Sequence, residues 1–210
     1  MVKQGDLLWT PSAERVANAE ITRYLDWLRA NRGLDFADYH ALYAWSVKDV
    51  PAFWASVWDY FEIKSSAPYT TVLADARMPG AKWFPGAKLN YAEHILRQAR
   101  PGEAAAWVAS EQSPLAPLMW ETLVEDVTRF ADRLREAGVT AGDRVVAFMP
   151  NIPETVVAFL AAASLGAVWS SCSPDFGVRS VLDRFRQIEP KVLVCVDGYF
   201  YNGRPFDRTQ

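Results

Sequence analysis

The alternation of short apolar runs with helical segments in residues 144–196 most restricts the folds open to this chain. The apolar runs are nearly continuous, which is typical of strands that are buried on both faces of a parallel sheet. The segments between them have the length of helices that cross over from one strand to the next. Strands are predicted at 144–149, 167–171 and 191–196, and helices at 153–165 and about 178–187. The sequence therefore predicts an α/β fold with a βαβαβ unit.

The residues before this unit extend the same pattern. Residues 105–109 are a candidate strand, and residues 120–137 carry apolar side chains at helical spacing up to Gly138, which would end that helix. Ahead of the helix that starts at Pro153, Asn151 is a candidate N-cap.

The first half of the chain is irregular and rich in aromatic residues, and it holds six of the nine tryptophans. Apolar spacing predicts a helix over 21–28 that Gly33 ends, a second helix from about Asp35, and a third that Asp49 caps. An aromatic stripe on such helices indicates packing rather than a binding site.

The change from the irregular, aromatic-rich sequence to the regular strand–helix pattern falls near residues 99–103, in the sequence RQARPGE. We therefore divide the chain into a first region, residues 1–100, and a second domain, residues 101–210.

The net charge of -3 and the pI near 5.5 argue against a protein that mainly binds a phosphate backbone, because such a surface is basic. No apolar run approaches the roughly 20 residues that cross a bilayer, and the N-terminus lacks the apolar stretch of a secretory signal. We therefore expect a cytoplasmic protein that binds neither nucleic acid nor a membrane.

Few residues suggest metal or redox chemistry. Cys172 and Cys195 are too few for a disulfide framework or a zinc site, and we expect both to be reduced. His40 and His94 have no carboxylate or cysteine at ligand spacing. The sequence assigns no metal ligand and no catalytic residue.

Ligands of doubly wound sheets bind beyond the carboxyl ends of the strands. Here those loops are residues 149–151, 171–176 and 197–204, and they contain neither common type of glycine-rich phosphate loop. Arg204 follows the last strand, where a guanidinium could bind a phosphate through two hydrogen bonds. Taken alone, it is more simply a solvated surface arginine.

Several segments resemble the adenylate-forming acyl-CoA synthetases and, within them, the acetoacetyl-CoA synthetase branch. GDRVVAFMPNIPETVVAFLAAASLGA shares the pattern of the wider superfamily, whereas SPDFG followed by VLDRFRQIEPKVL is typical of that branch. The other matching segments are YHALYAWSVKDVPAFWASVWDYF, WFPGAKLNYAEHIL and VCVDGYFYNGR. The resemblance implies an N-terminal helical auxiliary region followed by the first βαβαβ units of the large adenylation domain, which is a partial fold.

The resemblance also implies a two-step reaction. ATP and a carboxylic acid, here acetoacetate, give an acyl-adenylate and diphosphate, and the thiol of coenzyme A then displaces AMP to give acetoacetyl-CoA. Mg²⁺ would shield the phosphate charge in the first step. The family's phosphate loop, its adenine and magnesium motifs and its catalytic lysine have no counterpart and would lie beyond Gln210. We therefore expect the isolated chain to be inactive and to bind no cofactor tightly, with the missing C-terminal part of the same protein as a partner.

In acetyl-CoA synthetases a short loop after the strand that corresponds to residues 191–196 contacts the nucleotide end of coenzyme A, with an arginine at each end. The matching residues are Tyr201, Asn202, Gly203 and Arg204. Arg204 keeps the charge, whereas Tyr201 replaces the other arginine and would stack on the adenine instead.

Pro174 and Asp175 stand where the acetyl enzymes have glycines, in a turn near the pantetheine tunnel, and would form a different tunnel wall. Two alternatives remain open. One is an acetyl- or propionyl-CoA synthetase, against which the SPDFG and QIEPK segments count. The other is a non-catalytic remnant or interaction module that kept the fold.

Overall fold

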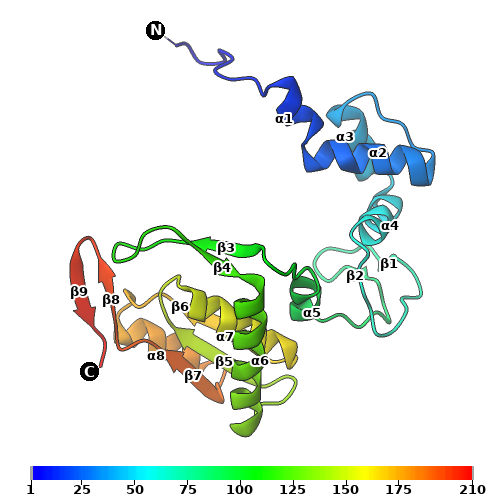
Figure 1. Ribbon diagram of the computed structural model, residues 1–210. Helices are drawn as coiled ribbons and strands as arrows, with labels where there is room; N and C mark the ends of the chain where they lie inside the picture. The colour runs from blue at the N-terminus through cyan, green and yellow to red at the C-terminus, as the bar shows by residue number, and fades with distance from the viewer. Residues whose placement is uncertain (1, 210) are drawn as a thin grey trace. The chain divides into compact units, whose positions relative to one another are not determined.

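The computed structural model describes residues 2–209 and divides into two compact units, one up to Leu89 and one from Asn90 onward (Figure 1). Each unit is built around its own hydrophobic core. The predicted boundary at 99–103 follows a short helix of the second unit, and the assignment of residues 1–100 and 101–210 as separate domains stays a prediction.

The first unit consists of helices and a short antiparallel strand pair. Gly33 ends the second helix with a φ of 65°, as predicted. Asp49 caps the fourth helix by accepting the Ala52 N–H at 3.1 Å, also as predicted. The helix predicted from about Asp35 begins later, because Asp38 is its N-cap. The elements are α1 (Ala13–Ala17), α2 (Glu20–Arg32), α3 (Tyr39–Lys48), α4 (Val50–Tyr60), β1 (Leu73–Asp75) and β2 (Lys82–Trp83).

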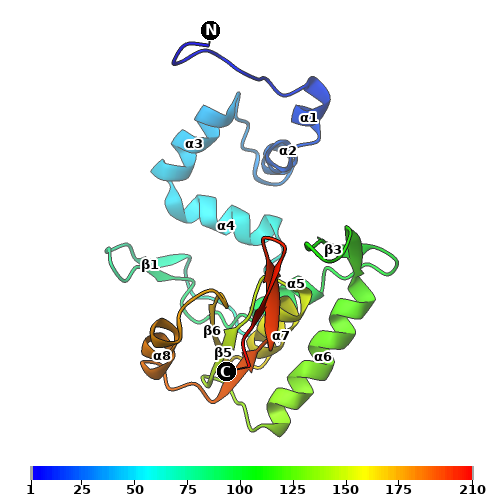
Figure 2. The ribbon, with the colours of Figure 1, turned by 90° about the vertical axis from the view of Figure 1, so that its left-hand side faces the viewer.

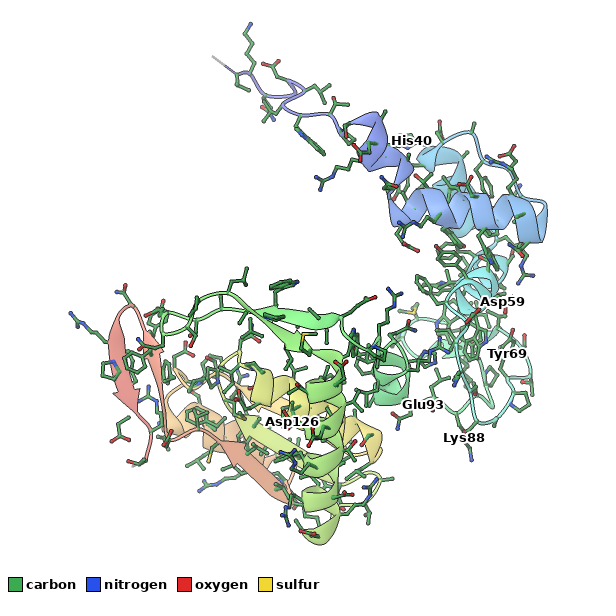
Figure 3. The ribbon with its side chains drawn as sticks, in the orientation of Figure 1. His40, Asp59, Tyr69, Lys88, Glu93 and Asp126 are labelled. Atoms are coloured by element: carbon green, nitrogen blue, oxygen red, sulfur yellow. The ribbon has the colours of Figure 1, made fainter. Side chains whose placement is uncertain are left out.

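Aromatic side chains hold this first unit together. Tyr24 on α2 lies 5.0 Å from the Tyr60 ring, and its hydroxyl lies 2.5 Å from Ser56 Oγ on α4. Around β2, the Phe84 ring packs 4.6 Å from Trp58 and 5.1 Å from Tyr69, which is labelled in Figure 3. The aromatic stripe predicted to serve packing is only partly in this unit's core: Phe53 packs against the core cluster, whereas Trp54 is 42% and Phe61 is 52% exposed.

The second unit contains the predicted α/β pattern. Its elements are α5 (Tyr91–Leu96), β3 (Ala104–Val108), β4 (Ala116–Met119), α6 (Trp120–Glu136), β5 (Arg144–Phe148), α7 (Pro153–Ser164), β6 (Val168–Cys172), α8 (Val178–Arg186), β7 (Val192–Cys195), β8 (Gly198–Tyr201) and β9 (Arg204–Asp207). Every strand and helix expected between residues 105 and 196 is present, with ends that differ by only a few residues. The strands β4, β8 and β9 were not expected.

The central sheet is parallel and has the order β6-β5-β7. Val145 belongs to a core cluster with α6 and α7, whereas Val146 belongs to another with Phe185 of α8. Neighbouring residues of β5 therefore point to opposite faces, and each face is covered by helices (Figure 2). This doubly wound arrangement confirms the predicted fold class.

Local capping differs from one expectation. Asn151 does not cap α7: Ile152 is the N-cap residue and makes no side-chain cap bond. Instead, Thr155 Oγ1 donates to the Pro150 carbonyl at 2.7 Å, which closes the turn before the helix. Asn90 does act as a cap, because its Oδ1 accepts the N–H of Glu93, labelled in Figure 3, at 3.1 Å. Within residues 2–209, no helix is both long and apolar enough to cross a membrane.

Candidate functional site

Residues 201–204, the match to the coenzyme A loop, form the tip of a β-hairpin. The strands β8 and β9 pair antiparallel and are joined by Asn202 and Gly203, whose φ angles are 51° and 70°. Positive φ at both central residues defines the two-residue turn that Asn-Gly sequences favour. At the base of the hairpin, a Cβ on Gly198 would come within 2.7 Å of the Phe206 carbonyl oxygen, so the close pairing requires glycine there.

The hairpin brings Tyr201 and Arg204 together as a cross-strand pair. Paired residues of an antiparallel ladder place their side chains on the same face of the ribbon, with Cβ atoms about 5 Å apart. Tyr201 is 66% exposed and Arg204 is also exposed. The tip therefore presents an aromatic ring and a guanidinium side by side to solvent, which suits a ligand that carries both a flat base and a phosphate.

Arg208, just after β9, fixes the base of the hairpin. Its Nε donates to the Pro174 carbonyl oxygen at 2.8 Å, and its Nη2 donates to the Tyr199 hydroxyl at 3.2 Å. The guanidinium carbon also lies 5.3 Å from the centre of the Tyr199 ring. The two candidate segments, the hairpin and the loop after β6, are thus joined by a residue that the sequence analysis did not single out.

In the loop after β6, Pro174 and Asp175 have different environments. Pro174 is buried, whereas Asp175 is exposed. Ser173 Oγ donates to the Asp175 carboxylate, and this hydrogen bond holds the pKa of Asp175 below its usual value, with the nearby charge of Arg208 adding to the effect. Asp175 therefore keeps its negative charge near the base of the hairpin at neutral pH.

The tip of the hairpin is bound by a side chain from the β3–β4 connection. Glu111 Oε1 accepts the N–H of Asn202 at 2.8 Å, and Oε2 accepts the N–H of Gly203 at 2.7 Å. Consecutive amides that point to one side form a concave site for an anion, and here a carboxylate fills it. Neither Glu111 nor Arg208 carries a motif that could have identified it from the sequence.

The third predicted ligand loop, residues 149–151, borders a cavity of about 340 Å³. Its lining includes Asn151, Ile152 and Pro153, together with the β3 residues Ala105 and Trp107. Its lining is mostly apolar, and it lies at the carboxyl end of β5 as the doubly wound topology predicts.

A second hollow of about 340 Å³ lies beside Asp126 on α6, a residue labelled in Figure 3. Phe130, Met149 and Val157 contribute to its apolar lining. Arg129 at its rim lies 3.4 Å from the Asp126 carboxylate, and the same guanidinium also pairs with Glu125. Charges that pair among themselves on an exposed helix are typical of a solvated face. Of the predicted ligand loop 149–151, Met149 is among the residues that line this hollow.

Cys172 is buried, whereas Cys195 is exposed, and both are free thiols. In the part of the chain that the structure describes, no group of three or more His, Cys, Asp or Glu side chains could hold a metal ion.

Two family models match the sequence. The model described as AMP-binding enzyme matches residues 97–209, which is more than half of the chain. The chain belongs to the AMP-binding enzyme family. A second model, described as the acetyl-coenzyme A synthetase N-terminus, matches residues 39–95.

Relatives of this AMP-binding enzyme chain include proteins named acetoacetyl-CoA synthetase. The protein from Rhizobium meliloti (strain 1021) is 44% identical over 95% of the chain, and that from Danio rerio is 39% identical over 100% of it. The solved acetoacetyl-CoA synthetase from Streptomyces lividans superposes with a TM-score of 0.90 at 51% identity and covers 95% of the chain. The chain spans 31% of the length of each of these three proteins.

The AMP-binding enzyme match contains every candidate site residue predicted from the sequence, since Pro174, Asp175 and residues 201–204 all fall within 97–209. The structure brings these two groups together through Arg208. Their assignment to coenzyme A stays a prediction.

Proposed function

We propose that this chain forms the N-terminal part of an acetoacetate–CoA ligase, which converts ATP, acetoacetate and CoA to acetoacetyl-CoA, AMP and diphosphate. The observation that carries the proposal is the 51% identity, over 95% of the chain, to a solved protein of that name. The family match and the acetoacetyl-CoA synthetases of two other organisms support the same assignment.

Within this proposal, the β8–β9 hairpin receives the nucleotide end of coenzyme A. The Arg204 guanidinium binds a phosphate, for which its planar set of donors is suited, and the Tyr201 ring stacks on the adenine. Both side chains are exposed and are cross-strand neighbours, which supports such a role. Pro174 and Asp175 would border the pantetheine arm, because Arg208 joins their loop to the hairpin.

The chemical step itself depends on groups that this sequence does not contain. Activation is needed because a carboxylate is a poor electrophile, whereas the acyl-adenylate offers AMP as a good leaving group. Mg²⁺, when bound, would shield the phosphates of ATP. Because the sequence lacks the phosphate loop and the catalytic lysine, we expect the 210 residues alone to be inactive and to bind ATP and CoA only weakly.

The two alternatives are distinguished by substrate and by turnover. In the acetyl- or propionyl-CoA synthetase alternative the acid is shorter, and the SPDFG and QIEPK segments count against it. In the non-catalytic alternative the fold remains and turnover is lost.

The test is an assay of diphosphate release with ATP, CoA and a series of acids. We expect no turnover from the 210-residue chain and acetoacetate-selective turnover from the longest protein that its reading frame encodes. Activity of the 210 residues alone would contradict their proposed dependence on further residues. A preference for acetate in the longer protein would contradict the substrate assignment, and no turnover with any acid would favour the non-catalytic alternative.

A further inference from the structure

Among the contacts described above, those of Glu111 attach the tip of the β8–β9 hairpin to the β3–β4 connection. Its two carboxylate oxygens accept one N–H each from Asn202 and Gly203, at 2.8 and 2.7 Å. This geometry requires both amides to face the same side, which the positive φ angles of the two residues provide. The contact joins residues 91 and 92 positions apart in sequence, so it fixes the tip against another part of the unit.

The tip has little packing of its own to hold it. Tyr201 is 66% exposed and Phe200 is 48% exposed. Arg208 holds the hairpin at its base, through the Pro174 carbonyl, at the end opposite the Asn202–Gly203 turn. Two attachments, one at each end, define the direction in which the hairpin points, and removal of one of them leaves the tip free to move.

We propose that Glu111 is a positioning residue for coenzyme A, which fixes the turn so that Arg204 meets the phosphate of the nucleotide end. The proposal rests on the proposed function. The Glu111 carboxylate accepts the N–H of both turn residues, so these two backbone donors are not available to the phosphate. The phosphate is therefore bound by the Arg204 guanidinium. Affinity then depends on how well that one side chain is oriented in advance.

The negative charge of Glu111 has an opposing effect, since it repels an incoming phosphate. Glu111 is exposed, and water reduces the repulsion between two such charges to about 1 kcal/mol even at a separation of about 4 Å, while salt weakens it further as the separation approaches about 8 Å. The ordering of the turn backbone by Glu111 is not weakened in this way. Without Glu111, the turn would be ordered only when coenzyme A binds, and that entropic cost would lower the affinity. Positioning therefore outweighs repulsion, and loss of Glu111 weakens coenzyme A binding rather than strengthening it.

The experiment compares Glu111→Ala and Glu111→Gln with Glu125→Ala in the longest protein that the reading frame encodes. Glu125 is a matched control, because it is an exposed glutamate that pairs with Arg129 on α6. We expect Glu111→Ala to raise the KM for CoA about fivefold to tenfold, the scale of one lost attachment. Glu111→Gln, which keeps the shape and one acceptor, gives a smaller rise. The kcat at saturating CoA and the KM for ATP stay at the wild-type values, and Glu125→Ala changes none of these.

A second substrate, dephospho-CoA, connects the effect to the phosphate. We expect Glu111→Ala and Arg204→Ala both to reduce the preference for CoA over dephospho-CoA. A lower KM for CoA in Glu111→Gln would overturn the proposal in favour of repulsion. Equal changes in kcat and in both KM values would overturn it in favour of a general structural role. If wild-type protein shows no acetoacetate-dependent turnover, the proposed function fails; if turnover is present and Glu111→Ala is indistinguishable from wild type, only this inference fails.

Discussion

The two compact units have cores of different chemistry. In the second unit, Val145, Val146 and Ala147 are 0% exposed. Val145 packs with aliphatic side chains of α6 and α7, and Val146 packs on the other face with Phe185 of α8. In the first unit, the buried hydrophobic cluster is small and is surrounded by half-buried aromatic rings. One core is aliphatic and is sealed between layers, while the other relies on ring contacts and on the polar pair of Tyr24 and Ser56.

This difference shows how the type of apolar residue in each unit relates to its stability. Continuous aliphatic runs allow many equivalent contacts, so the second unit distributes its stabilisation over two faces of a sheet. Aromatic rings contribute large areas at few positions and with preferred geometries, and a buried hydroxyl must find a partner. Changes in the second unit should therefore act through packing volume, and changes in the first through individual contacts.

The largest expected effect comes from the aliphatic core. Leu160 on α7 is 2% exposed, and Leu160→Ala should lower the free energy of unfolding of the second unit by about 3 kcal/mol, through lost burial and a cavity. Val156→Ala, on the same helix at a site that is 41% exposed, is the control and should cost well under half as much. Hydrogen exchange read by mass spectrometry should show the loss in peptides of β5 and α7. Equal loss in peptides of α2 and α4 would contradict the independence of the two cores.

A smaller effect is expected from the polar pair of the first unit. Tyr24→Phe removes a hydroxyl that lies 2.5 Å from Ser56 Oγ and leaves the ring contacts in place. We expect Tyr24→Phe and Ser56→Ala each to lower the free energy of unfolding of the first unit by about 1 kcal/mol, as measured by hydrogen exchange in peptides of α2 and α4. The double variant should cost less than the sum, because the bond is lost only once. Additive costs would mean that the two hydroxyls act independently.

The periodic part of the second unit was predictable because its strands are buried on both faces and its helices cover them. The short strands were missed: β4 contains Pro117 and β9 contains Pro205, and proline weakens a strand prediction. The hairpin tip carried a usable signal in Asn202–Gly203, a favoured pair for tight turns.

The attachments of that hairpin were not predictable from the sequence. Arg208 reaches a carbonyl 34 positions away, and Glu111 reaches amides more than 90 positions away. Such contacts depend on how loops meet after folding. Local patterns report only neighbours in sequence.

The smallest effect concerns Asp143, at the turn before β5, and it tests whether a surface contact adds to the aliphatic core beside it. Its Oδ2 accepts the Thr140 N–H at 2.7 Å and lies 3.0 Å from Lys191 Nζ. The backbone hydrogen bond from Thr140 is the main cause that lowers the pKa of Asp143 to about 2, and the bond from Lys191 adds to it. Because the folded pKa lies below the unfolded value of 3.8, the stabilisation is complete above about pH 4 and is lost as the pH falls toward 2.

The stability difference between wild type and Asp143→Asn, measured as a urea midpoint, should therefore be constant near neutral pH and shrink between about pH 4 and 2. Lys191→Gln keeps both bonds from Thr140 and removes the cation, together with the hydrogen bond that Lys191 Nζ donates to the Gly138 carbonyl. Because the Gly138 carbonyl does not titrate, this variant should reduce the pH dependence of the urea midpoint without abolishing it. A pH dependence in Lys191→Gln as small as that in Asp143→Asn would show that the ion pair dominates. In that case the turn before β5 would be stabilised by charge rather than by its backbone amide, and the second unit would share with the first a reliance on individual contacts.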